Sequence, residues 1–166
     1  MNEAYLCLGG NLGNREENLS RVKEFIQQKA GRIIAESSIY ETAAWGVSEQ
    51  GDYLNQVIKI ATELQPEVLM EGLLAIEVLM GRERTGEQWA ARTMDIDILL
   101  YNKLCIQEDR LSIPHPRLHL RNFVLVPLNE IAADAIHPFL KLSMKQLLAI
   151  CPDTSVGVRK FSSSFV

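Results

Sequence analysis

The sequence predicts a single α+β domain over residues 1–166, built as an antiparallel sheet with helices packed on its faces. Three observations predict this class. Of the 166 residues, 47% are hydrophobic and 23% are charged, which suffices for one ordinary core. Short apolar runs of strand length alternate with longer stretches of helical periodicity. Glycine and proline separate these segments, and no stretch holds 18 consecutive apolar residues.

The first half of the chain is expected to contain a strand, a helix and two more strands. Ala4–Leu8 is a short apolar run closed by a glycine-rich tight turn over residues 9–13. The next segment repeats apolar residues at helical spacing, with Asn14 as its N-cap and Gly31 just past its end. The remaining segments are strands over Ile33–Tyr40 and Tyr53–Leu64, with a loop over 41–52 between them.

The second half is expected to add a helix, two strands and two short helices. Pro66 suits the first turn of a helix that Gly81 ends, and a charged loop over 82–92 follows. The later segments are a strand over Thr93–Tyr101, a hairpin turn at Asn102-Lys103 into a strand over 104–107, and helices near Arg121–Ala132 and Ser143–Ile150. The order strand, helix, strand, strand, helix, strand is typical of a ferredoxin-like sandwich.

The charge balance narrows the classes of partner. Seventeen Lys and Arg residues stand against 21 Asp and Glu, which gives a net charge of −4 and a pI near 5.4. We expect no nucleic-acid partner, because non-specific binding requires many basic residues to displace counterions from phosphates. Charged residues interrupt the first 25 positions, so we expect a cytoplasmic protein without a signal peptide or a membrane partner. We also expect a monomer. Cys7, Cys105 and Cys151 are far apart, which favours buried reduced thiols over disulfides or a zinc site.

The sharpest chemical feature is the pair of carboxylates in Asp95-Ile96-Asp97. Side chains alternate along a strand, so both carboxylates project from one face while Ile96, Ile98 and Leu100 face the core. Carboxylates at this spacing lie about 7 Å apart at Cα and can converge on one or two hard cations, of which magnesium is the obvious candidate. The alternative is the solvated outer face of an ordinary strand.

Basic residues flank this strand on both sides. Arg82, Arg84 and Arg92 precede it. A guanidinium group can bind two oxygens of one phosphate at once. Metal-binding carboxylates beside several arginines form the usual charge pattern of phosphoryl transfer. Taken separately, the three arginines fit a solvated surface better than a phosphate site. A histidine in such a segment is as often structural as functional. The candidates for phosphate contact after the strand are Arg110, His115, Arg117 and Arg121.

Aromatic and amide side chains suggest a site for a flat heterocycle. Tyr53 and Asn55 begin one expected strand, and Phe123 begins an expected helix. Such residues can sandwich a ring and hydrogen-bond its edge, although from these residues alone ordinary core packing is the favoured alternative. The glycine-rich segment 9–13 lacks the Gly-Lys-Ser/Thr ending of a P-loop, so we interpret it as a tight turn near the site.

Several ordered motifs then carry a resemblance over nearly the whole chain. The central one is Arg92–Leu100, with Trp89 ahead of it and Pro114-His115-Pro116 behind it. The other matching segments are 8–13, Tyr40-Glu41-Thr42, 52–55, 81–84, 121–123 and 127–128. In this combination the sequence closely resembles the 6-hydroxymethyl-7,8-dihydropterin pyrophosphokinase family.

The resemblance implies an enzyme of folate biosynthesis that transfers pyrophosphate from ATP to the hydroxymethyl group of the dihydropterin and releases AMP. It implies two Mg²⁺ ions held by Asp95 and Asp97, ATP as co-substrate, and catalytic roles for Arg82 and Arg92. The implied ATP-binding residues are Arg84, Trp89, Ile98, Arg110, Leu111, Ser112, His115 and Arg121. The implied pterin-binding residues are Thr42, Ala43, Trp45, Tyr53, Asn55 and Phe123, with Tyr53 and Phe123 sandwiching the ring.

Two other classes fit parts of the pattern. A ferredoxin-like RNA-binding module shares the expected order of elements, but the strands expected around 4–8 and 56–60 lack the aromatic pairs that stack bases. A metal-dependent phosphohydrolase would use the same two aspartates, but it leaves Tyr53 and Phe123 unexplained.

Overall fold

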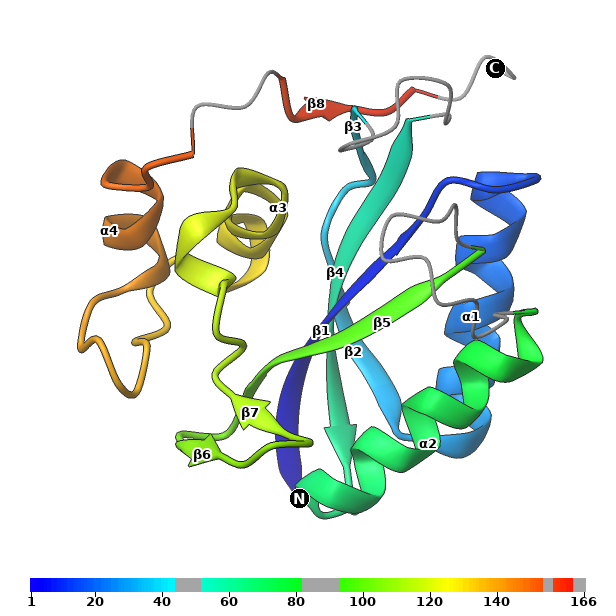
Figure 1. Ribbon diagram of the computed structural model, residues 1–166, viewed down its shortest axis with the longest axis horizontal. Helices are drawn as coiled ribbons and strands as arrows, with labels where there is room; N and C mark the ends of the chain where they lie inside the picture. Colours follow the sequence, from blue (N-terminus) through cyan, green and yellow to red (C-terminus); the bar gives the residue numbers. More distant parts are fainter. Residues whose placement is uncertain (44–51, 82–92, 154–156, 163–166) are drawn as a thin grey trace.

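The computed structural model describes residues 1–43, 52–81, 93–153 and 157–162 (Figure 1). Its longer elements are β1 (Asn2–Gly10), α1 (Arg15–Lys29), β2 (Arg32–Glu36), β3 (Tyr40–Thr42), β4 (Tyr53–Thr62), α2 (Pro66–Leu79), β5 (Asp95–Tyr101), α3 (Asn122–Ala132) and α4 (Met144–Ala149). Its short elements are β6 (Ile106–Gln107), β7 (Ser112–Ile113), the 3-10 helix η1 (Leu118–Leu120) and β8 (Arg159–Lys160). Among the described helices, none has the length and apolar character that crossing a bilayer requires.

The main sheet has the ferredoxin-like arrangement. Its strands are ordered β5-β1-β4-β3-β8, and β2 also pairs with β4. β1 lies between β4 and β5 and is antiparallel to both. Each of the first two helices therefore connects two strands that lie on either side of a third, since α1 links β1 to β2 around β4 and α2 links β4 to β5 around β1. The predicted fold class is confirmed.

Where the sequence predicts one strand over 33–40, the structure has two, and both pair with β4. Ser37 lies between them and is buried. Its amide donates to the Val57 carbonyl at 2.8 Å, and its hydroxyl accepts from the Val57 amide at 3.0 Å. A side chain thus replaces a backbone acceptor of the ladder, which divides the strand. β3 continues to Thr42, so the loop expected over 41–52 begins later than predicted.

Helices cover both faces of the sheet (Figure 1). α1 and α2 pack on one face, where Leu6 and Leu8 of β1 enter a core that includes Leu73 of α2. α3 and α4 cover the other face, where Cys7 of β1 enters a second core with Leu147 of α4. Successive residues of β1 therefore serve opposite cores, as strand geometry requires. We refer to the two sides of the sheet as the α1 face and the α3 face.

The glycine-rich segment after β1 differs in part from the prediction. Gly9 and Gly10 extend β1 and pair with β4, so the turn occupies only residues 11–14. Asn14 caps α1 as predicted, because its side chain accepts a hydrogen bond from the Glu17 amide at 3.1 Å.

The prediction that β5 and the next strand form a hairpin is wrong. The chain does turn at Asn102, where the Leu104 amide donates to the Tyr101 carbonyl at 3.1 Å, but β6 then pairs with β7 and not with β5. Asn102 is bound to β1 instead. Its amide donates to the Glu3 carbonyl at 2.8 Å, and its side chain accepts from the Glu3 amide at 2.9 Å. Local residues identify the turn, whereas the partner of the next strand depends on the tertiary fold.

Terminal residues mark the other predicted helices. Pro66 occupies the start of α2. Ser143 forms a capping box at α4, because its hydroxyl accepts from the Gln146 amide at 3.1 Å and the Gln146 side chain accepts from the Ser143 amide at 2.9 Å. The helices expected near 121–132 and 143–150 correspond to α3 and α4, whereas β7, η1 and β8 were not predicted.

Candidate active site

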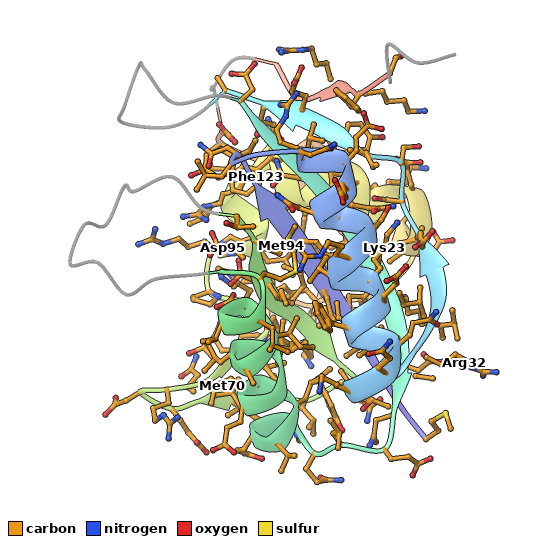
Figure 2. The ribbon with its side chains drawn as sticks, turned by 90° about the vertical axis from the view of Figure 1, so that its right-hand side faces the viewer. Lys23, Arg32, Met70, Met94, Asp95 and Phe123 are labelled. Atoms are coloured by element: carbon orange, nitrogen blue, oxygen red, sulfur yellow. The ribbon has the colours of Figure 1, made fainter. Side chains whose placement is uncertain are left out.

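Two carboxylates lie on the α3 face at the start of β5. Asp95 and Asp97 alternate with Ile96 and Ile98, whose side chains are buried in the core of the α1 face. The two carboxylates thus share one face, as the alternation predicts. Asp95 is half-buried and Asp97 is exposed. Figure 2 shows Asp95 beside Met94, where β5 begins.

A β-bulge at Leu99 reverses the alternation further along β5. The pairing of β5 with β1 shifts by one residue there, and Leu99 and Leu100 both join the core of the α3 face. The prediction that Leu100 faces the same core as Ile98 is therefore wrong. The bulge also positions another candidate residue, since the Leu99 carbonyl accepts a hydrogen bond from the His115 amide at 3.0 Å.

Cys7 lies next to the carboxylates on the α3 face. It pairs with Asp97 across the ladder and is buried. Burial raises the pKa of the Cys7 thiol strongly, the charges of Asp97 and Asp95 raise it further, and Arg121 opposes them. The thiol therefore stays protonated and unreactive at neutral pH. The three cysteines are all free but differ in exposure, with Cys7 buried, Cys151 half-buried and Cys105 exposed.

Arg121 brings positive charge to the same face. It follows η1 and directly precedes α3. Burial lowers the pKa of Arg121 and the charge of Arg117 lowers it further, while Asp97 opposes the shift. The guanidinium remains charged because its ordinary pKa is so high. Its central carbon lies 5.4 Å from the centroid of the Phe123 ring, within the range of a cation-π contact.

The N-terminus of α3 is capped from a distant part of the chain. The Asn122 amide donates to Oδ2 of Asp153 at 2.9 Å, and the Asn122 side chain donates to the Asp153 carbonyl at 3.2 Å. Arg121, at the N-cap position, makes no side-chain cap. Asp153, which follows α4, therefore takes this role and helps to fix the start of α3 beside Arg121.

His115 is a neutral imidazole next to two arginines. Its Nδ1 accepts a hydrogen bond from the Arg117 amide at 3.1 Å. Burial lowers the pKa of His115 to about 4, and the charges of Arg121 and Arg117 contribute to the shift. Because Nδ1 is an acceptor, the neutral ring carries its proton on Nε2, where it can be donated to an anionic oxygen.

The residues expected to contact the heterocycle lie on the same face. The Asn55 side chain donates to the Thr42 hydroxyl at 2.9 Å, and both residues are buried. Tyr53 and Asn55 alternate with Leu54, which belongs to the core of the α1 face. Gly9 lies opposite Asn55, and a Cβ there would come within 2.5 Å of Asn55 Oδ1. Glycine at position 9 therefore leaves room for the amide.

The structure brings some predicted site residues together and leaves others apart. Those around the α3 face are Thr42, Tyr53, Asn55, Asp95, Asp97, His115, Arg121 and Phe123. Ile98 and Leu111 are instead buried in the core of the α1 face, with Ser112 half-buried, Arg110 exposed and Ala43 exposed beyond β3. Trp45, Arg82, Arg84, Trp89 and Arg92 lie outside the described residues.

Sequence reasoning missed one buried acid close to the site. Glu77 of α2 is only 3% exposed, and its carboxylate accepts a hydrogen bond from the Ile96 amide at 2.8 Å. It thereby ties α2 to β5 between the two aspartates. The available signal was its spacing, since Glu77 lies four residues after Leu73 and therefore on the apolar side of the predicted helix.

Fold and site together define a ferredoxin-like α+β protein that carries two carboxylates, a partly buried arginine and a buried amide on one sheet face. A family model described as 7,8-dihydro-6-hydroxymethylpterin-pyrophosphokinase (HPPK) matches residues 5–133. The chain belongs to this family, as its motifs indicated. As a member of this family it is an ATP-dependent pyrophosphokinase. The two alternatives, an RNA-binding module and a phosphohydrolase, are not favoured.

Individual relatives agree with the family model. Two bacterial proteins named 2-amino-4-hydroxy-6-hydroxymethyldihydropteridine pyrophosphokinase are similar over most of their length. The one from Haemophilus influenzae is 44% identical over 136 residues, covering 81% of this chain and 84% of that protein. The one from Bacillus subtilis is 43% identical over 131 residues, covering 78% of each.

Solved structures support the fold. Wild-type Plasmodium falciparum HPPK-DHPS with pteroate aligns with a TM-score of 0.70 at 17% identity, covering 89% of this chain and 44% of that one. The same protein with SDX-DHP gives a TM-score of 0.69 and covers 90% and 43%. This chain therefore spans less than half the length of those structures, and at such identity the likeness concerns the fold alone.

Proposed function

We propose that the α3 face of this chain is where pyrophosphate passes from ATP to 6-hydroxymethyl-7,8-dihydropterin, the reaction named by its family. The hydroxymethyl oxygen attacks the β-phosphorus and releases its proton to water, the bond from that phosphorus to the bridging oxygen of AMP breaks, and AMP leaves. The observation that carries the proposal is the gathering of acceptor, donor and stacking groups on one face, with Asp95 and Asp97 beside Arg121 and Asn55 bound to Thr42.

The carboxylates fit magnesium bound together with ATP. Within the described ranges, no group of three or more His, Cys, Asp or Glu side chains could hold a metal by itself. Mg²⁺ is usually bound by one or two carboxylates plus phosphate oxygens, and Asp95 and Asp97 supply the protein part of such a set. Two bound Mg²⁺ ions would neutralise phosphate charge and activate the β-phosphorus. Both aspartates would hold them.

The chain's own residues would bind and orient the two substrates. Arg121 and the neutral His115 would contact phosphates, the first by charge and the second through the proton on Nε2. Asn55 and Thr42 would hydrogen-bond the edge of the pterin, with Tyr53 and Phe123 on either side of the ring. The remaining roles follow the motifs alone: catalysis by Arg82 and Arg92, contacts to ATP by Arg84, Trp89, Ile98, Arg110, Leu111 and Ser112, and contacts to the pterin by Ala43 and Trp45.

One assay tests the reaction. The protein is incubated with ATP, magnesium and 6-hydroxymethyl-7,8-dihydropterin, and the nucleotides are then separated. AMP that appears only when the pterin is present supports the proposal. ADP as the product, or hydrolysis of ATP without the pterin, would overturn it.

We also propose that the chain acts as a single-domain monomer in the cytoplasm. Sedimentation of the purified protein tests the oligomeric state, and localisation of a tagged copy tests the compartment.

The role of the carboxylates has a direct test in Asp97→Ala. We expect turnover to fall by about 100-fold or more, because a metal ligand is lost, while the circular dichroism spectrum stays that of the wild type. Asp134→Ala is the matched control, since Asp134 is an exposed acid just beyond α3 and should leave turnover unchanged. A collapsed spectrum for Asp97→Ala would instead assign Asp97 a structural role.

A further inference from the structure

Four charged side chains form a cluster on the opposite side of the sheet from Thr42, Tyr53 and Asn55, which we call the pterin-side residues. Glu41 of β3 accepts hydrogen bonds from two arginines, through Oε2 from Arg15 at 2.7 Å and through Oε1 from Arg159 at 2.8 Å. Arg159 also donates to Oδ2 of Asp52 at 2.9 Å, and Arg15 donates to the Asp52 carbonyl at 2.9 Å. We call Arg15, Glu41, Asp52 and Arg159 the Glu41 cluster.

The Glu41 cluster joins four elements that are distant in the sequence. Arg15 is the first residue of α1, Asp52 directly precedes β4, and Arg159 lies on β8. β8 adds to the edge of β3, with Arg159 paired to Glu41, at the end of the sheet opposite the N-terminus (Figure 1). The segment after β8 is also bound to the residues before β3, because the Phe161 amide donates to the Ile39 carbonyl at 2.9 Å.

The Glu41 cluster and the pterin-side residues occupy opposite faces of the same strands. Tyr40 hydrogen-bonds Glu130 of α3, so Tyr40 and Thr42 point to the α3 face. Glu41, between them, points to the α1 face, where it meets Arg15 of α1. Each pterin-side residue is thus close in the chain to a member of the cluster: Thr42 follows Glu41, and Tyr53 and Asn55 follow Asp52.

Burial makes Glu41 the centre of the cluster. Its side chain is 17% exposed, against 57% for Arg159 and 39% for Asp52. Burial alone would raise the pKa of Glu41, but the hydrogen bonds from Arg15 and Arg159 lower it overall. An ionised, mostly buried carboxylate with two guanidinium partners holds a narrow range of positions, because moving away leaves its charge without compensation.

We propose that Arg159 is a positioning residue for the pterin, which acts through Glu41 and Asp52 to hold Thr42, Tyr53 and Asn55 in register. The inference rests on the proposed function of the α3 face. It goes beyond the family's shared region, because the family model ends at residue 133 and β8 lies after that point. The C-terminal strand thus becomes part of the binding site without touching the ligand.

The test compares Arg159→Ala with Lys160→Ala. Lys160 is the neighbouring cation on β8 and pairs with Tyr40, outside the Glu41 cluster. Pterin affinity is measured by calorimetric titration with 6-hydroxymethyl-7,8-dihydropterin in the presence of magnesium and a non-hydrolysable ATP analogue. We expect Arg159→Ala to raise the pterin Kd and KM about fivefold, with the KM for ATP and kcat unchanged, and Lys160→Ala to change neither.

A double variant separates positioning from a general loss of structure. If Arg159 acts through Glu41, the pterin Kd of Arg159→Ala/Glu41→Ala should rise by less than the product of the two single effects. An unchanged pterin Kd in Arg159→Ala, an equal loss in Lys160→Ala, or fully multiplicative effects would overturn the inference. These outcomes are distinct from failure of the proposed function, which would appear in the wild type as no pterin-dependent AMP.

Discussion

At the scale of single residues, His115 shows how burial and neighbouring charge set a protonation state. Its pKa of about 4 lies below the ordinary value of 6.5 because burial, then Arg121 and Arg117, disfavour the charged ring. The sequence places His115 in a basic segment between two prolines, but it cannot reveal this shift. The bulge at Leu99, whose carbonyl accepts from the His115 amide, arises where β5 pairs with β1, a contact between distant parts of the chain.

This shift makes stability depend on pH. Between about pH 6.5 and pH 4 the unfolded chain protonates His115 while the folded chain does not, so the free energy of unfolding falls as the pH falls. His115→Asn keeps an acceptor for the Arg117 amide but does not titrate. We expect the loss of stability between pH 7 and pH 5 to be about 1–2 kcal/mol larger in the wild type than in His115→Asn. Urea denaturation at the two pH values measures this difference, and equal losses would contradict a half-buried, neutral imidazole.

At the scale of elements, the contact between β1 and β4 determines whether Asn55 keeps its orientation. A Cβ at position 9 would come within 2.5 Å of Asn55 Oδ1, so Gly9→Ala should turn this side chain away and break its hydrogen bond to Thr42. Since only the end of a side chain must move, the sheet should persist. We expect the KM for the pterin to rise about tenfold and the KM for ATP to stay the same in steady-state kinetics.

Gly72→Ala is the matched control for that variant. Gly72 lies within α2, and an added Cβ there meets nothing within 4 Å. Alanine in a helix interior is more favourable than glycine by about 0.5–1 kcal/mol, so Gly72→Ala should raise the unfolding midpoint and leave both KM values unchanged. If Gly72→Ala also weakened pterin binding, the effect of Gly9→Ala could not be assigned to Asn55.

Elements whose ends carry local signals were predictable from the sequence. Asn14, Pro66 and Ser143 mark the starts of α1, α2 and α4 because each meets a backbone requirement of a helix terminus. Pairings decided by distant groups were not predictable. The Ser37 hydroxyl divides β2 from β3 by bonding to β4, and Asn102 binds to β1 instead of closing a hairpin.

The candidate site was predictable to the extent that strand alternation decides it. Asp95 and Asp97 face the same side because they lie before the bulge, whereas Leu100 lies after it and changes face. The motifs also named Glu41 and Asp52, but no local pattern connects them to Arg159, more than a hundred residues later. Charge clusters of this kind depend on how the chain returns to the sheet.

At the scale of the whole molecule, one sheet lies between two hydrophobic cores and contributes side chains to both. Leu73 of α2 lies in the core of the α1 face and Leu147 of α4 in that of the α3 face, each 2% exposed. The three longest strands, β1, β4 and β5, each contribute side chains to both cores. Neither core can therefore lose its packing without exposing the sheet, which favours a single cooperative unit.

Cooperativity can be checked with paired truncations. Leu73→Ala and Leu147→Ala should each lower the free energy of unfolding by about 2–5 kcal/mol and shift one common transition. Calorimetry and circular dichroism should then report the same midpoint for each variant. Two separated transitions in Leu147→Ala, with the α1-face core surviving alone, would contradict a single unit and divide the chain into two folding domains.

Two residues near the end of the sequence contact opposite ends of the site, and this bears on the order in which the protein folds during translation. Asp153 caps α3 beside Arg121, and Arg159 reaches Glu41 and Asp52 behind the pterin-side residues. Both emerge from the ribosome after all the strands and helices that they touch. A nascent chain that ends before residue 153 already contains strands β1 to β5 and both carboxylates of β5, yet it lacks β8 and both contacts. Synthesis thus orders assembly, with the scaffold first and the final geometry of the site last.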